Sequence, residues 1–277
     1  MSRTFNQVIS PTGNNLLVVD GLNLAFRYKY AKKTTFAVEY CNTVASLAKS
    51  YGASKVVVLF DRGSSFRENI LATYKQARKD KRKEQTEEEA QEMEAFFDEF
   101  NNNTLTMLAV EHGYTVLGFK GVEADDIAAY LVKSQKDNYD HIWLISSDKD
   151  WDLLINETTS RFSYVTRKEV TFENWKEHYG YEIDEHISIK VLMGDTGDSV
   201  PGVPGVGEKR AISLIEQYGD ALSIYDSIPL DGRAKYIQNL NEFGDNIITN
   251  YQLMDLLTYC EEAIGKENIE QINLELE

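Results

Sequence analysis

Apolar positions along the chain form short continuous runs separated by segments with a helical period. Three of these runs end in acidic residues: LLVVD at Asp20, VVVLFD at Asp61, and HIWLISSDKD at Asp148 and Asp150. Continuous apolar strands that alternate with helices are typical of a parallel sheet covered on both faces, and such sheets bind ligands at the carboxyl ends of their strands. The pattern predicts an α/β core whose sheet carries several carboxylates at one edge.

Two helices are predicted from the intervening periods. Apolar residues recur at helical spacing from Phe36 to Tyr51 and stop at Gly52, which is typical of the glycine that follows a helix. A second apolar stripe runs from Ala124 to Val132, directly after the strand-like run YTVLGF. Strands and helices therefore alternate, as an α/β core requires.

An insertion and a boundary interrupt this regular order. Residues 67–103 hold a basic block, KQARKDKRK, that leads into an acidic segment with phenylalanines at helical spacing, and they are predicted to form a helical insertion. Beyond about residue 185 the strand signals stop, while helical periods continue around a glycine-rich hairpin. We expect a core over residues 1–185 and a helical region over residues 186–277, without a linker between them.

Charge is segregated along the chain, so its sum does not identify the partner. The formal net charge is −16 at pH 7, which alone would disfavour a polyanion such as nucleic acid. Residues 75–83, however, contain six basic residues and one acidic residue, and residues 84–94 contain six acidic residues. A local basic surface is therefore compatible with the acidic total.

Composition limits the class of protein. The chain has 277 residues, of which 42% are hydrophobic and 27% are charged, and these values are typical of a globular protein. We find no apolar run of membrane-spanning length and no N-terminal run of signal-peptide length. Cys41 and Cys260 have neither metal-like nor disulfide-like spacing. We expect a protein of the reducing cytoplasm, without membrane association.

Acidic residues are concentrated at predicted strand ends, helix starts and short turns. A single acid at such a place more often caps a helix than binds a metal, so the inference depends on their number. The candidate metal ligands are Asp20, Asp61, Glu123, Asp125, Asp126, Asp148, Asp150, Asp195 and Asp198. Carboxylates gathered at one edge repel one another unless cations are present, and oxygen ligands suit hard ions such as Mg²⁺ or Mn²⁺. The four histidines lie outside any ligand spacing, which disfavours zinc.

This ligand chemistry favours hydrolysis at phosphorus. Two hard cations about 4 Å apart activate water and stabilise the charge that develops on the attacking and leaving oxygens. Such a site also needs a protein cation near the scissile phosphate, and Lys75 and Arg78 in the basic block are candidates. The alternative interpretation is that this block is a solvated helix face. The leading prediction is a phosphodiester hydrolase.

The glycine-rich segment GVPGVGEKRA, at residues 202–211, precedes a predicted helix. Open N–H groups at the helix start, together with Lys209 and Arg210, would bind a nucleic-acid backbone without reading its sequence. A nucleotide-binding P-loop is not supported, because Glu208 follows the last glycine where that motif has lysine and then serine or threonine. A plain turn between two helices remains open at this point.

Six motifs, taken in order, resemble the 5′-nuclease, or flap endonuclease, family over nearly the whole chain. They are VVDGLNL, VLFDRG, an insertion that carries Tyr74, Lys75 and Arg78, GVEADD, ISSDKDWD and MGDTGDSVPGVPGVGEKRA. The chain is most similar to the stand-alone phage enzymes of that family. The resemblance implies a PIN-like α/β core with a parallel sheet, a helical arch at about residues 67–103, and a C-terminal helical DNA-binding module of the helix–three-turn–helix type.

The resemblance also implies roles for individual residues. All nine candidate acids would bind two or more Mg²⁺ ions, which Mn²⁺ is expected to replace. Lys75 and Arg78 would steer or stabilise the scissile phosphate as catalytic residues. Hairpin carbonyls would bind K⁺, and we select those of Val200, Val203 and Val206. The expected DNA-binding residues are Tyr74, Lys190, Lys209, Arg210 and Lys235.

The activity that the resemblance implies is structure-specific hydrolysis of DNA near junctions of single strand and duplex. The enzyme would act as a flap endonuclease and a 5′ to 3′ exonuclease on 5′ flaps, nicks or free 5′ ends. It would serve replication or repair, for example in primer or flap removal, as a monomeric, phage-encoded protein in the cytoplasm of a bacterial cell.

Three other classes of protein would require different sequence features. A PIN-type ribonuclease would share the acidic sheet edge but would need neither the arch nor the hairpin. A catalytically silent junction-binding protein would keep the hairpin and lose acids, yet every acidic position is filled. A phosphatase with an aspartate nucleophile would carry a second aspartate two residues after Asp20, where Leu22 stands.

Overall fold

The computed structural model describes residues 13–277, so the stretch of residues 1–12, in which no signal-like run is found, lies outside the described residues. The chain forms two compact units, and each of them is discontinuous in sequence. The first unit comprises the chain up to Ser64, Gln85–Glu173 and the residues from Cys260 onward, and the second comprises Ser65–Glu84 and Asn174–Tyr259. Each unit is made of several segments, so this division does not correspond to one boundary along the chain. The boundary expected after residue 185 remains a prediction.

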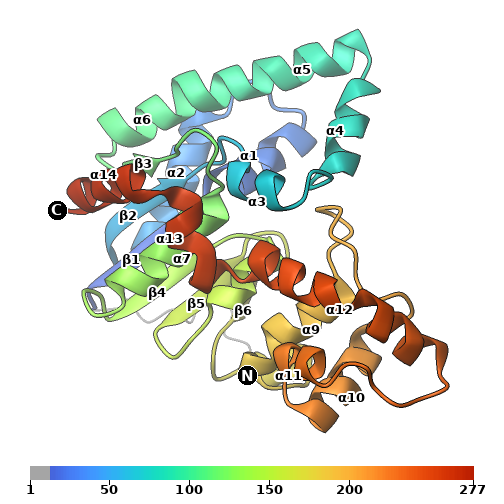
Figure 1. Ribbon diagram of the computed structural model, residues 1–277. Helices are drawn as coiled ribbons and strands as arrows, with labels where there is room; N and C mark the ends of the chain where they lie inside the picture. The colour runs from blue at the N-terminus through green and yellow to red at the C-terminus, as the bar shows by residue number, and fades with distance from the viewer. Residues whose placement is uncertain (1–12) are drawn as a thin grey trace. The chain divides into compact units, whose positions relative to one another are not determined.

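The first unit is built on a six-stranded sheet with the strand order β3-β2-β1-β4-β5-β6 (Figure 1). Its strands are β1 Asn15–Asp20, β2 Ala53–Leu59, β3 Thr115–Leu117, β4 His141–Ile145, β5 Thr159–Ser163 and β6 Lys168–Val170. All hydrogen-bonded neighbours are parallel except β5 and β6. In the central strand, Leu17 pairs with Val56 on one side and with Trp143 on the other. The predicted parallel sheet is confirmed, with one antiparallel edge strand in addition.

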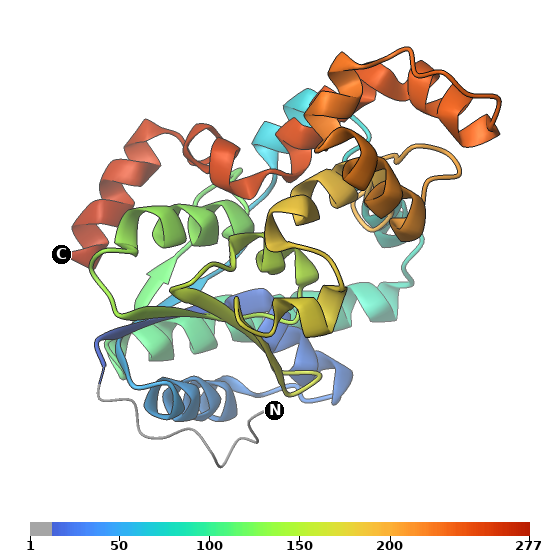
Figure 2. The same ribbon diagram turned by 90° about the horizontal axis from the view of Figure 1, so that it is seen from below.

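Helices cover both faces of this sheet. They are α1 Gly21–Tyr30, α2 Ala37–Ser50, α5 Glu87–Asp98, a π-helix at Glu99–Thr104, α6 Leu105–Val110, α7 Ala124–Gln135, a 3₁₀ helix at Lys149–Leu154, the end of α13 Leu256–Ile264, and α14 Lys266–Leu276. Figure 2 shows α2 with α5 and α6 on one face and α7 with α14 on the other. Leu17 and Val19 join a core cluster with α2, while Leu16 and Val18, which point to the opposite face, are also fully buried. Two covered faces explain why the strands are continuous apolar runs.

The two helices predicted for this unit are confirmed. α2 ends at Ser50, and Gly52 follows with a φ of +56°, a conformation that favours glycine. α7 begins at Ala124, with Glu123 as its N-cap, and Ile127 is fully buried on its apolar face. The chain runs from β3 into α7, so the acids of the GVEADD motif lie beyond the carboxyl end of a strand.

The second unit is helical among the described residues. Its elements are α3 Ser65–Ile70, α4 Gln76–Lys83, α8 Trp175–Tyr179, a 3₁₀ helix at Ile183–Glu185, α9 His186–Met193, α10 Glu208–Tyr218, α11 Ala221–Asp226, α12 Lys235–Met254 and the start of α13. The predicted apolar stripe of α10 is confirmed, since Ala211, Leu214 and Ile215 are buried. At Gly202 a side-chain Cβ would lie 1.9 Å from the carbonyl oxygen of Met193, so only glycine fits this turn.

The predicted class, an α/β core with a helical C-terminal region, is confirmed. The sequence predicts neither β5 nor β6. No helix among residues 13–277 combines the length and the apolar character that crossing a membrane requires.

Candidate metal centre

Asp20 is the last residue of the central strand β1 and the N-cap of α1. One of its carboxylate oxygens accepts a hydrogen bond from the backbone N–H of Asn23 at 3.1 Å, and the other accepts one from the hydroxyl of Ser146 at 2.7 Å. Ser146 directly follows β4, the parallel neighbour of β1. The side chain is therefore fixed at the carboxyl edge of the sheet, where Asp20 is only 7% exposed.

Asp61, Glu123 and Asp125 meet at the start of α7. Asp61 lies two residues beyond β2 and accepts a hydrogen bond from the backbone N–H of Ala124 at 2.6 Å. Glu123 is the N-cap of the helix and is buried. Asp125 accepts a hydrogen bond from the indole N–H of the buried Trp151 at 2.6 Å. The N-terminal end of a helix stabilises negative charge, which helps these acids to lie together.

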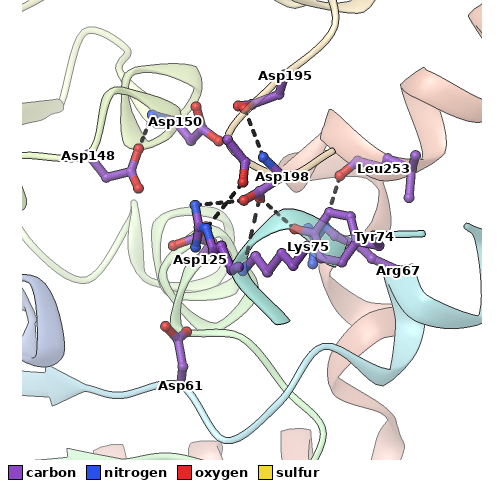
Figure 3. A network of polar contacts seen from close by, with 12 residues as sticks. Asp61, Arg67, Tyr74, Lys75, Asp125, Asp148, Asp150, Asp195, Asp198 and Leu253 are labelled. Atoms are coloured by element: carbon purple, nitrogen blue, oxygen red, sulfur yellow. Dashed lines mark hydrogen bonds and ion pairs between the residues drawn. The ribbon is translucent and has the colours of Figure 1, made fainter. Parts of the chain in front are cut away.

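Asp148 and Asp150 lie at the start of the 3₁₀ helix that follows β4. Asp148 is the N-cap of the 3₁₀ helix, and its side chain accepts a hydrogen bond from the backbone N–H of Asp150 at 3.0 Å (Figure 3). The backbone N–H of Asp148 donates to the hydroxyl oxygen of Ser146 at 3.0 Å. The Ser146 hydroxyl thus links this turn to Asp20.

Burial and, after it, mutual repulsion raise the pKa of two of these carboxylates. Burial, followed by the charge of Asp61 and more weakly by that of Asp148, raises the pKa of Asp20 from 3.8 to about 7. Burial also raises the pKa of Asp125 well above its usual range, and Asp61, Asp148, Glu123 and Asp20 add to this shift. Protons or cations that neutralise part of this charge would stabilise the group.

Asp126 has a different environment. It is buried on α7 but is not among the acids that raise the pKa of Asp20 or Asp125. Burial raises the pKa of the Cys260 thiol to about 11, and Asp126 contributes to that shift, so Cys260 is one of its neighbours.

Protein ligands alone do not complete a metal shell in this arrangement. Within the described range, 13–277, no three acidic, histidine or cysteine side chains converge closely enough to hold one ion. Mg²⁺ commonly takes one or two carboxylates and keeps water or substrate oxygens as its other ligands. The arrangement is therefore compatible with Mg²⁺ and unlike a closed structural site.

Asp195 and Asp198 belong to the second unit, where they meet the predicted arch residues (Figure 3). Asp198 accepts a hydrogen bond from the Tyr74 hydroxyl at 2.8 Å and pairs with the Arg78 guanidinium at 2.7 Å. The Lys75 ammonium lies 4.0 Å from the same carboxylate. Asp195 accepts a hydrogen bond from the backbone N–H of Asp198 at 3.1 Å. One acid therefore brings Tyr74, Lys75 and Arg78 together.

The backbone around Lys75 is also fixed. Its N–H donates to the carbonyl of Asp198 at 2.8 Å, and the N–H of Ala77 donates to the Ser199 hydroxyl at 3.2 Å. Lys75 has a φ of +56°, a left-handed conformation that costs a residue other than glycine about 1 to 3 kcal/mol. Burial raises the pKa of Asp198 although Lys75 and Arg78 act in the opposite direction. Strained backbone of this kind is concentrated at functional sites.

The hairpin valines selected for a monovalent cation are buried. Val200, Val203 and Val206 are 3%, 2% and 7% exposed. The carbonyl of Val200 accepts a hydrogen bond from the N–H of Asp195, and the carbonyl of Val203 accepts one from the N–H of Val206, both at 2.9 Å. Each of these two oxygens thus has one lone pair already in use.

The basic residues expected to bind DNA all lie in the second unit. Lys209 and Arg210 are exposed in the first turn of α10, and Lys235 is exposed in the first turn of α12. Lys190 is half-buried on α9. Their contacts with DNA remain predictions.

Two residues that the sequence prediction leaves out hold the acids in place, namely Ser146 and Trp151. Ser146 lies within ISSDKDWD next to predicted ligands, and its place directly after a strand is a usable signal. Trp151 lies in the same motif, next to Asp150, but the motif does not reveal that its indole N–H donates to Asp125.

A pair of arginines at the same edge of the sheet is also missing from the prediction. The guanidinium carbons of Arg27 and Arg167 lie 4.3 and 4.4 Å from the centroid of the Tyr164 ring. Arg27 borders a small cavity that Asn23 and Ser146 also line. The arginines are far apart in sequence, so no local motif joins them.

Two family models match the chain. The model for the 5′-3′ exonuclease N-terminal resolvase-like domain matches residues 15–180, and the model for the 5′-3′ exonuclease C-terminal SAM fold matches residues 182–275. The chain therefore belongs to the 5′-3′ exonuclease family and is a nuclease, a hydrolase of phosphodiester bonds. The predicted family and the predicted class of enzyme are confirmed.

Known relatives agree with this assignment. The chain is 44% identical over 254 residues to the flap endonuclease of Escherichia phage T5, covering 91% of this chain and 86% of the relative. A crystal structure of the phage T5 protein with metal ions matches with a TM-score of 0.87 and 42% identity, covering 95% of this chain and 97% of that one. A complex of the phage T5 flap endonuclease with DNA and metal ions matches with a TM-score of 0.89 and 40% identity, covering 95% and 100%.

Proposed function

We propose that this nuclease is a flap endonuclease and 5′ to 3′ exonuclease that cuts DNA near junctions of single strand and duplex. Its substrates would be DNA molecules with 5′ flaps, nicks or free 5′ ends. The observation that carries the proposal is the group of carboxylates at the sheet edge, where burial and then mutual repulsion raise the pKa of Asp20 and Asp125. Buried carboxylates that repel one another are the expected environment for divalent cations.

The acidic residues would form a site for two or more Mg²⁺ ions, with Mn²⁺ as a substitute. The donors are all carboxylate oxygens, which hard cations prefer over softer metals. The proposed ligands are Asp20, Asp61, Glu123, Asp125, Asp126, Asp148, Asp150, Asp195 and Asp198. When bound, such ions lower the pKa of the attacking water and stabilise charge on the attacking and leaving oxygens.

Lys75 and Arg78 would act on the scissile phosphate. Both are cationic and both are held by Asp198, which limits the conformations that they can adopt. A positioned cation stabilises the negative charge that develops on phosphoryl oxygens during hydrolysis. Tyr74, whose hydroxyl donates to the same acid, would help to hold the DNA strand. The products would be a 5′-phosphate and a 3′-hydroxyl.

The hairpin and its neighbours would bind the duplex backbone. Lys209, Arg210 and Lys235 are exposed at helix N-terminal turns, where they can neutralise phosphates without reading bases. Lys190 would add a contact from α9. Binding should weaken steeply with salt, because each neutralised phosphate releases counterions.

A K⁺ ion would stiffen this hairpin through carbonyl oxygens. The candidate ligands are the carbonyls of Val200, Val203 and Val206. A carbonyl that already accepts one hydrogen bond keeps a second lone pair, so the contacts of Val200 and Val203 are compatible with this role.

The proposed setting follows from the relatives. The similar phage T5 protein favours a phage-encoded enzyme that works in the bacterial cytoplasm. There it would remove primers or flaps during replication or repair, as a monomer.

Replacing Asp148 tests the metal proposal. The variant Asp148→Ala should lose turnover of a labelled 5′ flap in Mg²⁺ while it binds the flap within a few-fold of the parent, since the acid would hold an ion and not DNA. The matched control is Asp137→Ala, an exposed acid just after α7, which should keep full turnover. Undiminished turnover by Asp148→Ala would refute the assignment.

The choice of substrate separates the candidate functions. Parallel assays should use a 5′ flap, a nicked duplex and an RNA single strand, each with Mg²⁺ and with chelator. Cleavage of both DNA substrates only with Mg²⁺ supports the proposal. Preferential cleavage of the RNA would support a ribonuclease, and binding without cleavage would support an inactive junction-binding protein.

A further inference from the structure

The hairpin before α10 is held in shape by α12, a helix that follows it at some distance along the chain (Figure 1). The side-chain amide of Asn239 donates a hydrogen bond to the carbonyl of Pro204 at 2.7 Å. Farther along the helix, the buried Asn250 donates to the carbonyls of Val191 and Pro201, both at 2.9 Å. Two asparagines therefore fix carbonyls at both ends of the turn 201–204.

Arg210 is restrained by the same two elements. Its guanidinium carbon lies 4.9 Å from the centroid of the Tyr236 ring, and one of its terminal nitrogens donates to the carbonyl of Gly205. Tyr236 and Asn239 are three residues apart on α12, so they lie on neighbouring positions of one helix face. The first turns of α12 thus contact both the hairpin and the arginine beside it.

We propose that Tyr236 and Asn239 are positioning residues, which hold the Arg210 guanidinium and the hairpin in the arrangement that binds a DNA phosphate. This inference rests on the proposed function, in which Arg210 binds the duplex backbone. Arginine offers five N–H donors, and only one nitrogen contacts Gly205, so donors remain for a phosphate.

The benefit of this arrangement is a lower cost of ordering. A long exposed side chain loses rotamer freedom when it binds a ligand, and a side chain that is already restrained loses less. The flat guanidinium can stack on a ring and donate in its own plane at the same time. Tyr236 would therefore strengthen binding without touching the DNA, and its effect would pass through Arg210.

A double-mutant cycle tests this coupling. The dissociation constant for a 5′-flap duplex is measured in chelator for the parent, Tyr236→Leu, Arg210→Ala and the double variant. Tyr236→Leu should weaken binding about threefold to fivefold, the range for an exposed cation–π contact, and should have no further effect once Arg210 is alanine. Tyr236→Phe keeps the ring and should restore binding.

Kinetic and structural controls accompany the cycle. In Mg²⁺, Tyr236→Leu should raise KM for the flap substrate and leave kcat and the binding of a single strand unchanged. Tyr225→Leu, which changes a half-buried tyrosine of α11, is the matched control for the loss of a phenol. If Tyr236→Leu lowers the thermal midpoint more than this control does, Asn239→Ala provides the second route, with the same expected rise in KM.

Three outcomes would overturn the inference. Binding by Tyr236→Leu equal to that of the parent would show that the ring does not matter. An equal loss in the Arg210→Ala background would show that Tyr236 acts independently of Arg210. Parent-like flap binding by Arg210→Ala would instead contradict the role of the hairpin in the proposed function, and the positioning role would fail with it.

Discussion

Two carboxylates at the sheet edge are held by side-chain donors from other parts of the chain. Ser146 binds Asp20, and Trp151 binds Asp125. The hydrogen bond from Ser146 lowers the pKa of Asp20, yet burial and the charge of Asp61 outweigh it and raise that pKa to about 7. The folded protein is therefore less stable than it would be without these buried charges, as is usual at functional sites.

The first prediction concerns the charge of Asp20. Because the fold raises its pKa from 3.8 to about 7, the folded protein binds more protons than the unfolded chain between these values. In chelator, the free energy of unfolding should thus fall as pH rises through this range. Asp20→Asn removes the charge and should be more stable than the parent at pH 8, by up to about 4 kcal/mol, with a smaller difference at pH 5.5.

Urea unfolding at both pH values measures this difference. Asp137→Asn, an exposed acid, is the control and should follow the parent at each pH. Adding Mg²⁺ at pH 8 should stabilise the parent more than Asp20→Asn. A difference that shrinks as pH rises would contradict the raised pKa of Asp20.

At the scale of single residues, the acids are predictable and their partners are not. Asp20, Asp61 and Asp148 follow apolar runs, and a parallel sheet brings such positions to one edge. Trp151 follows the predicted ligand Asp150, yet the sequence does not indicate its partner. Its hydrogen bond to Asp125 depends on the packing of the 3₁₀ helix against α7, which no local pattern encodes.

At the scale of elements, α2 begins without a cap of its own. Its N-cap is Phe36, whose side chain makes no capping hydrogen bond. Glu99, in the π-helix after α5, accepts hydrogen bonds from the N–H groups of Phe36 and Ala37 at 2.8 and 3.0 Å. Burial alone would raise the pKa of Glu99, but these bonds and one from Asn103 outweigh it and lower the pKa.

The remote cap makes the stability of the fold depend on the charge of Glu99. Glu99→Ala should lower the free energy of unfolding by about 2 to 3 kcal/mol, because it removes two charge-assisted hydrogen bonds at a helix start. Glu99→Gln keeps an acceptor and should cost about 1 kcal/mol. Since the folded pKa of Glu99 lies below its ordinary value of 4.5, the advantage of the parent over Glu99→Gln is complete above pH 4.5 and disappears at lower pH.

Chemical unfolding between pH 3 and pH 7 tests both the loss of stability and its dependence on pH. Glu94→Gln, on an exposed position of α5, should match the parent throughout. If the difference in the free energy of unfolding between the parent and Glu99→Gln widened as pH fell, Glu99 would not act as a charged cap.

Some elements follow from the sequence pattern and others do not. The central strands are apolar because both faces of the sheet are covered, and the pattern therefore predicts them. β5 has the polar sequence TSRFS, yet all five of its residues are buried. Arg161 of this strand is tolerated because it forms a buried ion pair with Asp152 at 2.8 Å. A strand that depends on such a pair gives no apolar signal.

At the scale of the whole molecule, the chain passes from one compact unit to the other four times. The basic α4 belongs to the second unit, while the acidic α5 that follows it belongs to the first. The last residues, from Cys260 onward, return to the first unit. Sequence periods reveal the helices of this C-terminal region, but they do not reveal which unit each helix completes.

The segment from Cys260 onward packs in the first unit and should stabilise it. Cys260, Ile264 and Ile272 are 0%, 2% and 0% exposed. Asn273 accepts a hydrogen bond from the Tyr130 hydroxyl at 2.9 Å, which ties α14 to α7. A chain that ends at Tyr259 would lose all of these contacts, and a fully buried apolar side chain contributes about 1.5 to 3 kcal/mol.

The truncated chain should therefore be less stable by about 5 kcal/mol or more, which lowers the unfolding midpoint by about 10 to 20 °C. Hydrogen exchange locates the effect, since protection should fall first in β3 and α7 of the first unit and later in α10 of the second. Ile272→Ala in the full chain should lose protection in the same order of elements, and its free energy of unfolding should fall by about 2 to 5 kcal/mol. Leu274→Ala, at a 69% exposed position of α14, should leave exchange unchanged. Loss of protection in α10 before β3 would show that these residues support the second unit instead.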